Sequence, residues 1–175
     1  MKHKIYYFLL IVSLSLFISC NDDIDFDPIN EPLPLATTTG ANTFGFLLND
    51  KTWLPFIEDK NKNALSVVMD RDSTFMFSMN LISDKINRNE AIKIFLNCNK
   101  PGPCIPSTFT FVDTKIFLGC QVFDLRNSNL QFEITRLDYG AQIISGNFEI
   151  LGAVNSCGTE SIDITKGVFD CKFAK

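Results

Sequence analysis

Histidine, the side chain that most often carries acid–base and metal chemistry, occurs once in the 175-residue chain, as His3. It lies in residues 1–19, a segment that we expect to be removed as a signal peptide. The remaining chain would contain no imidazole, which excludes Ser-His-Asp and Cys-His catalysis and every metal site built on histidine. We therefore predict no catalytic residue, no metal ligand and no cofactor, and the chain is not expected to be an enzyme.

The sulfur chemistry begins at Cys20, which closes the stretch Phe17-Ile18-Ser19-Cys20. This stretch resembles a bacterial lipobox, although Phe17 stands where leucine is usual. In a lipobox the cysteine at this position is acylated and becomes the new amino terminus. The 13-residue apolar run before it is typical of a signal-peptide core and is too short to span ~30 Å of hydrocarbon. We predict a lipid anchor at Cys20, with fatty acyl chains such as palmitate; an ordinary secretory peptide is the alternative.

The other five cysteines are Cys98, Cys104, Cys120, Cys157 and Cys171. An oxidising location outside the cytoplasm permits disulfides, and an odd number leaves at least one thiol unpaired within the molecule. Cys98 and Cys104 flank a stiff Pro-Gly-Pro turn and are the first candidate pair. Cys171 alternates with two phenylalanines, so we expect it to be the buried free thiol, which leaves Cys120 with Cys157 by elimination.

Carboxylates offer two further kinds of site. Residues 59–63 match the first half of a calcium loop, but Ala64 replaces the glycine that the turn usually needs, so a solvated hairpin loop is the better interpretation. Glu133 and Glu149 fall on polar faces of adjacent predicted strands and could be near neighbours, as glycoside hydrolysis requires. Nothing in the sequence marks either glutamate as buried, so a carboxylate hydrolase is the least favoured function.

The segment that follows Cys20 is acidic and rich in proline. Residues 21–39 contain five acidic residues, three prolines and no lysine or arginine, so they cannot bury enough apolar surface to fold alone. We predict a lipidated tether over residues 20–39 and a single β-domain over residues 40–175. The cluster Asn21-Asp22-Asp23 resembles signals that direct some Gram-negative lipoproteins to the cell surface. We expect a cell-surface location on the outer membrane, with a periplasm-facing orientation as the alternative.

The charge of the processed chain restricts its partners. Loss of Lys2 and Lys4 with the signal changes the formal net charge from −4 to −6. Nucleic acid is excluded as a partner because its phosphates require a basic surface.

The elements that must position these residues are strands, because helical periodicity is absent and short alternating runs dominate. About ten strands with mostly short links predict an all-β antiparallel meander, forming either a sandwich or a barrel, with a lipocalin-like barrel as one form of the latter. The predicted strands are Phe44–Leu48, Thr52–Phe56, Leu65–Met69, Phe75–Ile82, Ala91–Cys98, Thr108–Val112, Ile116–Phe123, Leu130–Leu137, Ile143–Leu151 and Ile162–Phe173.

Phenylalanine dominates the apolar positions, with 17 in the chain against one tryptophan, Trp53. Alternate placement, as at Phe109 and Phe111, puts the rings on one sheet face, where each buries ~150–250 Å². A packed aromatic core is the favoured interpretation, and an aromatic cavity for an apolar ligand is the alternative.

Several stretches together resemble a domain-of-unknown-function family of Gram-negative lipoproteins, and the resemblance covers nearly all of the predicted domain. They are Gly40-Ala41-Asn42-Thr43-Phe44-Gly45, Trp53-Leu54-Pro55, Ile134-Thr135-Arg136-Leu137-Asp138, Ile144-Ser145-Gly146-Asn147-Phe148-Glu149 and Thr165-Lys166-Gly167-Val168-Phe169-Asp170. Members usually have threonine at the position of Asn147 and valine at that of Cys171. The resemblance implies a lipid-anchored all-β protein and no particular chemistry.

Two functions follow as expectations. The first is a lipid-anchored envelope protein that acts by binding either a small apolar ligand or an envelope partner. The second is a structural or adhesive surface component without a ligand. An internal cavity of ~300–1,000 Å³ lined by phenylalanine would favour a small ligand, and a filled core would not.

Overall fold

The computed structural model describes residues 31–57, 62–70, 76–85, 88–113, 120–125 and 128–174. Residues 59–61 of the calcium-like stretch 59–63, the signal segment and Cys20 lie outside these ranges.

The described chain forms two antiparallel sheets, and the predicted all-β fold is confirmed. Sheet A has the order β2-β1-β11-β10-β9-β6, and sheet B has the order β3-β4-β5-β7-β8. The strands of sheet A are β1 (Thr43–Leu48), β2 (Lys51–Trp53), β6 (Gly102–Pro103), β9 (Asn129–Asp138), β10 (Ile143–Val154) and β11 (Ser161–Lys172). Those of sheet B are β3 (Leu65–Asp70), β4 (Met76–Lys85), β5 (Arg88–Leu96), β7 (Thr108–Asp113) and β8 (Val122–Asp124).

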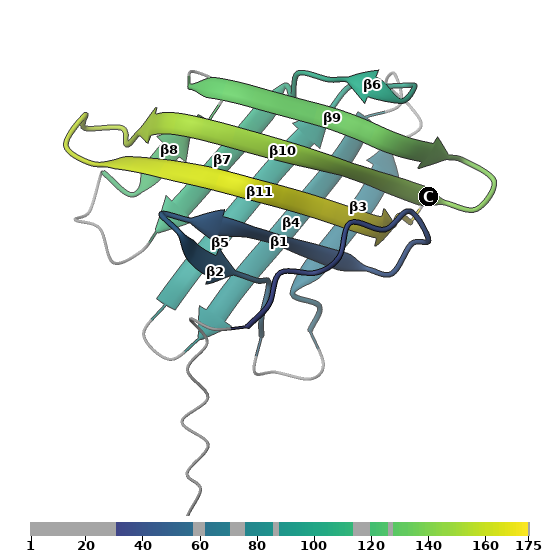
Figure 1. Cartoon of the computed structure of the whole chain (residues 1–175), viewed down its shortest axis with the longest axis horizontal. Helices are drawn as coiled ribbons and strands as arrows, with labels where there is room; N and C mark the ends of the chain where they lie inside the picture. Colours follow the sequence, from purple (N-terminus) through teal and green to yellow (C-terminus); the bar gives the residue numbers. More distant parts are fainter. Residues whose placement is uncertain are drawn as a thin grey trace, which may run out of the picture.

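The sheets face each other as a sandwich and do not close into the lipocalin-like barrel that alternation alone left open. Figure 1 shows sheet A in front of sheet B, with the strands of the two layers crossing obliquely. Short backbone pairings join the layers at their rims: Val68 with Ala174, Phe123 with Asn155, and Phe56 with Ser83. The two layers therefore share one core, and these three pairings among the described residues link them along its border.

Most neighbours in the sheets are neighbours in sequence, as expected for a meander, but two pairings are long-range. The first strand, β1, pairs with the last, β11, so that Thr43 lies opposite Asp170. The two-residue strand β6 pairs with β9 at Ile134 and Glu133. Local alternation carries no information about either pairing, because both partners lie far away along the chain.

Two predicted boundaries were wrong for local reasons. The strand predicted over Thr52–Phe56 ends at Trp53, since Pro55 has no N–H to extend a ladder. The turn predicted between Cys98 and Cys104 contains β6, where Gly102 adopts a φ of 123° that other residues rarely reach. By contrast, Asn49 and Asp50 both have positive φ and form the expected hairpin turn between β1 and β2.

Alternating apolar residues from both sheets fill the space between the layers. On β10 Phe148 lies 5.5 Å, centroid to centroid, from Phe109 of β7 in the opposite sheet, and 5.8 Å from Phe132 of β9. Phe44 of β1 packs 5.4 Å from the same Phe148 ring. The twelve largest fully buried side chains include seven phenylalanines, so the aromatic alternation in the sequence is a packed core.

Candidate functional site

The most densely hydrogen-bonded polar group described lies outside the core, where the chain before β1 crosses sheet A. Residues 31–42, which we name the strap, lead into β1 and pass over Asp170 of β11. Pro34 lies directly over Gly45, where even a Cβ would approach within 2.8 Å of the proline ring. The strap includes residues 31–39 of the predicted tether, so this part is attached to the domain.

Asp170 holds the strap through its carboxylate. Its Oδ2 accepts hydrogen bonds from Thr37 Oγ1 at 2.5 Å, from the N–H of Thr39 at 2.9 Å and from that of Ala41 at 3.2 Å. The same oxygen lies 3.3 Å from Thr39 Oγ1. Its Oδ1 accepts from the N–H of Gly40 at 2.8 Å and from Ser145 Oγ, on β10, at 2.6 Å. The carboxylate thus bridges three segments: the strap, β10 and β11.

The environment keeps Asp170 ionised although its side chain is only 1% exposed. Burial by itself raises the pKa, but the hydrogen bonds from Ser145, Thr37 and the backbone together outweigh it and hold the pKa well below the usual value of 3.8. A carboxylate so fully engaged by donors is unsuited to proton transfer, which needs an accessible group titrating near neutral pH. Its chemical role is to fix the strap.

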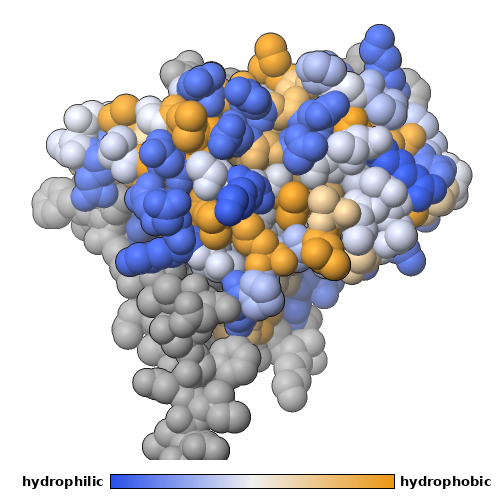
Figure 2. Space-filling model, viewed as in Figure 1, coloured by the Kyte–Doolittle hydropathy of each residue, from blue (hydrophilic) through white to orange (hydrophobic). Residues whose placement is uncertain are grey.

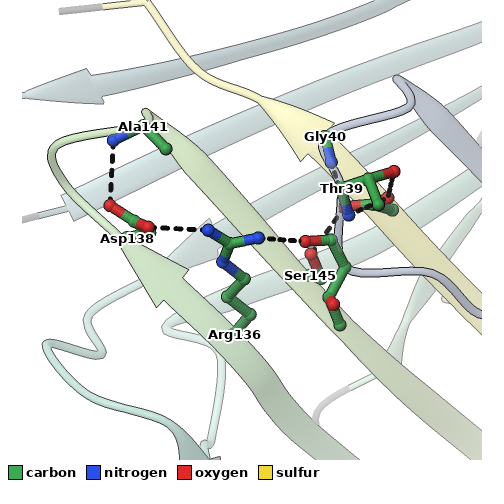
Figure 3. Close-up of polar contacts among 8 residues, drawn as sticks. Thr39, Gly40, Arg136, Asp138, Ala141 and Ser145 are labelled. Atoms are coloured by element: carbon green, nitrogen blue, oxygen red, sulfur yellow. Dashed lines mark hydrogen bonds and ion pairs between the residues drawn. The ribbon is translucent and has the colours of Figure 1, made fainter.

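A second clamp lies beside the first on β9. The Arg136 guanidinium donates to the carbonyl of Thr38 and, at 2.7 Å, to Oδ2 of Asp138. Oδ1 of Asp138 accepts the N–H of Ala141 at 2.8 Å, and this bond and the Arg136 pair lower the pKa of Asp138. Figure 3 shows this chain of contacts running from the turn after β9 to the strap. Arg136 thus provides the strap with a second, partly exposed attachment.

The alternation of β11 could have identified Asp170, but not what covers it. Phe169 and Cys171 are both buried, so Asp170 points to the outer face, where a charged residue is ordinary. Its partners Thr37 and Gly40 are 133 and 130 residues away in sequence. A contact over such a separation leaves no local pattern.

The cysteines pair as the sequence suggested. The Cα atoms of Cys98 and Cys104 are 6.1 Å apart, and those of Cys120 and Cys157 are 5.2 Å apart, both within the usual disulfide range. Cys171 is free and buried, and its thiol lies 3.5 Å from the carbonyl of Thr43. Burial raises the pKa of Cys171 to about 12, so this thiol is inert rather than nucleophilic.

The sequence patterns did not identify a second buried carboxylate, Glu90 on β5. The indole Nε1 of Trp53 donates to Glu90 Oε2 at 2.6 Å, and Glu90 is only 4% exposed. Glu90 lies opposite Asp113 of β7 in the ladder, and both line a small hollow of about 210 Å³ with Trp53 and Lys51. The short bond to the indole explains why a carboxylate is tolerated at the border of the core.

An open groove of about 680 Å³ lies at the rim where β3 meets the end of β11. Pro55, Phe56 and Ile57 line one part of it, and Lys172, Phe173 and Ala174 another. Phe56 is 40% exposed there. The groove lies outside the aromatic core, so it is a surface feature and differs from the internal cavity considered from the sequence.

The two glutamates considered for hydrolysis lie on the same face of the sheet, diagonal to each other in the β9–β10 ladder. Glu133 and Glu149 lie on adjacent strands of the outer face of sheet A, opposite Asn147 and Gln131 respectively, and Glu133 is exposed. Figure 2 shows this face as a mixture of hydrophilic and hydrophobic side chains. Among the described residues, no group of three or more acidic, cysteine or histidine side chains is placed to hold a metal ion.

No helix in the described part of the chain is long and apolar enough to cross a membrane. Comparison of the chain with protein-family models, with curated proteins and with solved structures found no match in any of the three.

Proposed function

We propose that the chain is a lipid-anchored lipoprotein of the outer membrane, exposed at the cell surface, whose β-sandwich acts by binding an envelope partner. The anchor rests on the lipobox-like stretch that ends at Cys20 and on the apolar run before it. The resemblance to a family of Gram-negative lipoproteins supports the same placement. A chain with two or three acyl groups would stay in the membrane, because each buried methylene contributes ~0.8 kcal/mol.

The packed interior is the observation that favours a surface partner over an enclosed apolar ligand. Rings from both sheets are in mutual contact, and Phe77, Phe109 and Phe123 have no exposed surface. A small apolar molecule would have to displace these rings, whereas the groove at the rim is already open. The alternative function, a structural or adhesive component, draws on the same packed core and differs in needing no specific partner.

Two measurements on cells test the anchor and its orientation. Metabolic labelling with a palmitate analogue should mark the wild-type protein and not a Cys20→Ser variant, and intact mass should show the loss of residues 1–19. Protease added to intact cells should degrade the protein if it is surface-exposed and spare it if it faces the periplasm. An unmodified thiol at position 20 in native material would contradict the anchor.

Binding is tested on material extracted from its own membrane. Native mass spectrometry should show a complex with a second polypeptide and no added small mass. Chemical cross-linking on intact cells should yield one defined adduct for a binding protein, and none for a purely structural component. A small apolar molecule that stays bound through purification would favour the ligand-binding alternative.

A further inference from the structure

The strap reverses direction before it becomes β1. Pro34 lies over Gly45 in the middle of β1, whereas Gly40 lies at the start of the strand, where Asp170 accepts its N–H. Gly40 and Asn42 have φ of 76° and 57°, in the left-handed region that permits a tight reversal. Figure 1 shows the strap as a dark trace that runs beside β1 up to this reversal. The strap therefore meets the sandwich beside the middle of β1, before the chain reaches the first residue of that strand.

This path determines how much chain lies between the predicted lipid anchor and the sandwich. Cys20 precedes Pro34 by 14 residues and Asn42 by 22 residues. At ~3.3–3.6 Å per residue, a fully extended chain from Cys20 spans at most ~50 Å to Pro34 and ~75–80 Å to Asn42. An attached strap therefore withholds eight residues, or ~25–30 Å of reach, from the tether.

The strap can leave the sandwich without taking β1 with it. Strand β1 is paired along both edges, with β2 and with β11, whereas residues 31–42 belong to no strand. The run of residues 37–39 is held by two side chains, Asp170 and Arg136. On release, Asp170 keeps its bond from Ser145 and gains contact with water, so opening exposes a charged group and leaves none unpaired in the core. A pull on the tether therefore acts on the strap before it acts on the strand.

We propose that the strap is a clasp on the lipid tether. When closed, it holds the sandwich close to the membrane and makes the tether leave beside Gly45. When opened by tension, it releases eight residues while both sheets stay folded. A partner that binds the sandwich farther from the bilayer supplies that tension. The inference rests on the proposed anchor at Cys20 and gives the proposed binding function an adjustable reach.

The clasp can be tested without a membrane, because Cys20 is a unique labelling site in the chain from residue 20. The other cysteines are in the two disulfides or, as Cys171, free and buried, so a naphthalene maleimide should attach to Cys20 alone. Trp53, the only tryptophan, is the energy donor, and it lies opposite Phe46 of β1, one residue from the place where Pro34 is held. Energy transfer from Trp53 to the dye therefore reports whether the strap is closed.

The strap variant replaces residues 34–38 by Gly-Ser-Gly-Ser-Gly, which removes the proline packing and the Thr37 hydroxyl without changing the sandwich. Thr39 then becomes the first attached residue, 19 residues from Cys20. Distance along a chain without fixed structure grows about as the square root of its length, and energy transfer falls with the sixth power of distance, so the ratio of transferred to retained excitation should fall about 2.5-fold.

The matched control makes the same replacement at residues 28–32, upstream of the clasp, and its transfer should equal that of the wild type. An unchanged ratio in the strap variant would overturn the proposal, as would an equal fall in the control, which would place the attachment upstream. The strap variant should still unfold cooperatively in urea. Loss of cooperative unfolding would show that the strap is part of the sandwich and is not a clasp, which is equally contrary.

Single-molecule pulling tests the response to tension, with one handle on Cys20 and the other at the carboxyl terminus. The wild-type chain should lengthen by a step of about 25 Å before the sheets unfold, and the strap variant should lack this step. Unfolding of the wild type in a single event would overturn the proposal. These measurements need no lipid, so a failed clasp leaves the anchor standing, and an unmodified Cys20 in native material contradicts the anchor without altering them.

Discussion

Replacing Asp170 by asparagine tests whether the buried carboxylate holds the strap to the sandwich. Asparagine keeps the shape of the side chain but turns one acceptor oxygen into a donor NH₂ group. With its oxygen at the Oδ2 position, the amide would place its NH₂ against the N–H of Gly40, 2.8 Å away, and against Ser145 Oγ. Ser145 can rotate to accept, whereas the buried N–H of Gly40 is left without a partner.

The magnitude follows from the bonds that change. Hydrogen bonds to a charged group contribute about 1.5–3 kcal/mol each, and an unpaired buried donor costs about 1–3 kcal/mol. Because the remaining bonds persist in weaker, neutral form, we expect Asp170→Asn to lower the free energy of unfolding by about 2–4 kcal/mol. With a slope of about 2 kcal/mol/M in urea, the midpoint would fall by about 1–2 M.

The assay is urea unfolding followed by the fluorescence of Trp53, the only tryptophan. Asp163→Asn is the matched control, because Asp163 lies on the same strand and accepts the N–H of Gly152 at 2.7 Å at an exposed position. Its cost should stay within about 0.5 kcal/mol. Limited proteolysis should also cut residues 31–41 faster in the Asp170 variant. Equal midpoints for the two variants would refute the assigned role.

The pH dependence gives an independent check. The pKa of Asp170 in the folded protein lies below the value of 3.8 expected when unfolded, so the unfolded state takes up the proton first as pH falls. The stabilisation is complete above about pH 4 and is lost as pH falls toward the folded-state value. The difference between wild type and Asp170→Asn should therefore narrow below about pH 4, and a constant difference would show that the charge is not responsible.

The remaining predictions concern the disulfides, the free thiol and one close approach. Loss of the Cys120–Cys157 disulfide, which spans 37 residues, should lower the free energy of unfolding by about 4 kcal/mol, and loss of Cys98–Cys104, which spans 6, by about 2 kcal/mol. The urea midpoints of variants with both cysteines of a pair replaced by alanine measure these two effects. A larger effect for the shorter loop would contradict the loop-entropy argument. Cys171 should resist alkylation at pH 8 until the protein unfolds, because burial raises its pKa to about 12, and Cys171→Val should change stability by less than about 1.5 kcal/mol. Gly146→Ala should cost about 3 kcal/mol, since its Cβ would lie 2.2 Å from the carbonyl oxygen of Glu133 and 2.5 Å from the Phe169 ring. Gly140→Ala, where the nearest atom is 3.4 Å away, is its control in thermal unfolding, and similar melting temperatures would show that β10 can shift to make room.

The sequence was informative where the signal is local. Alternation placed Ile92, Ile94 and Leu96 of β5 on one face, and all three are buried. The cysteines could be assigned because one pair flanks a short turn and Cys171 alternates with phenylalanines. Whether the strands form two separate sheets or one closed barrel was not predictable, because the two folds differ only in which distant strand edges pair.

The polar contacts and the groove at the surface could not be predicted from local sequence patterns. Asp170 is one of many acidic residues in the sequence, and only the strap above it makes it unusual. Glu90 was overlooked because its partner Trp53 lies on the other sheet, 37 residues away. The groove arises where β3, the end of β11 and residues 55–57 meet, and no single stretch contains it.

The place of β11 between β1 and β10 has a consequence for the order in which the protein can be built. Residues 161–172 are made after all the other described strands, yet they form an interior strand of sheet A. Until they are made, β1 and β10 each have an unpaired edge, and Asp170 is not yet available to accept hydrogen bonds from Thr37 and Thr39, which lie 133 and 131 residues earlier in the chain. Folding of sheet A must therefore wait until residues 161–172 have been made, and a chain halted before residue 161 should be captured by chaperones that bind unpaired strands.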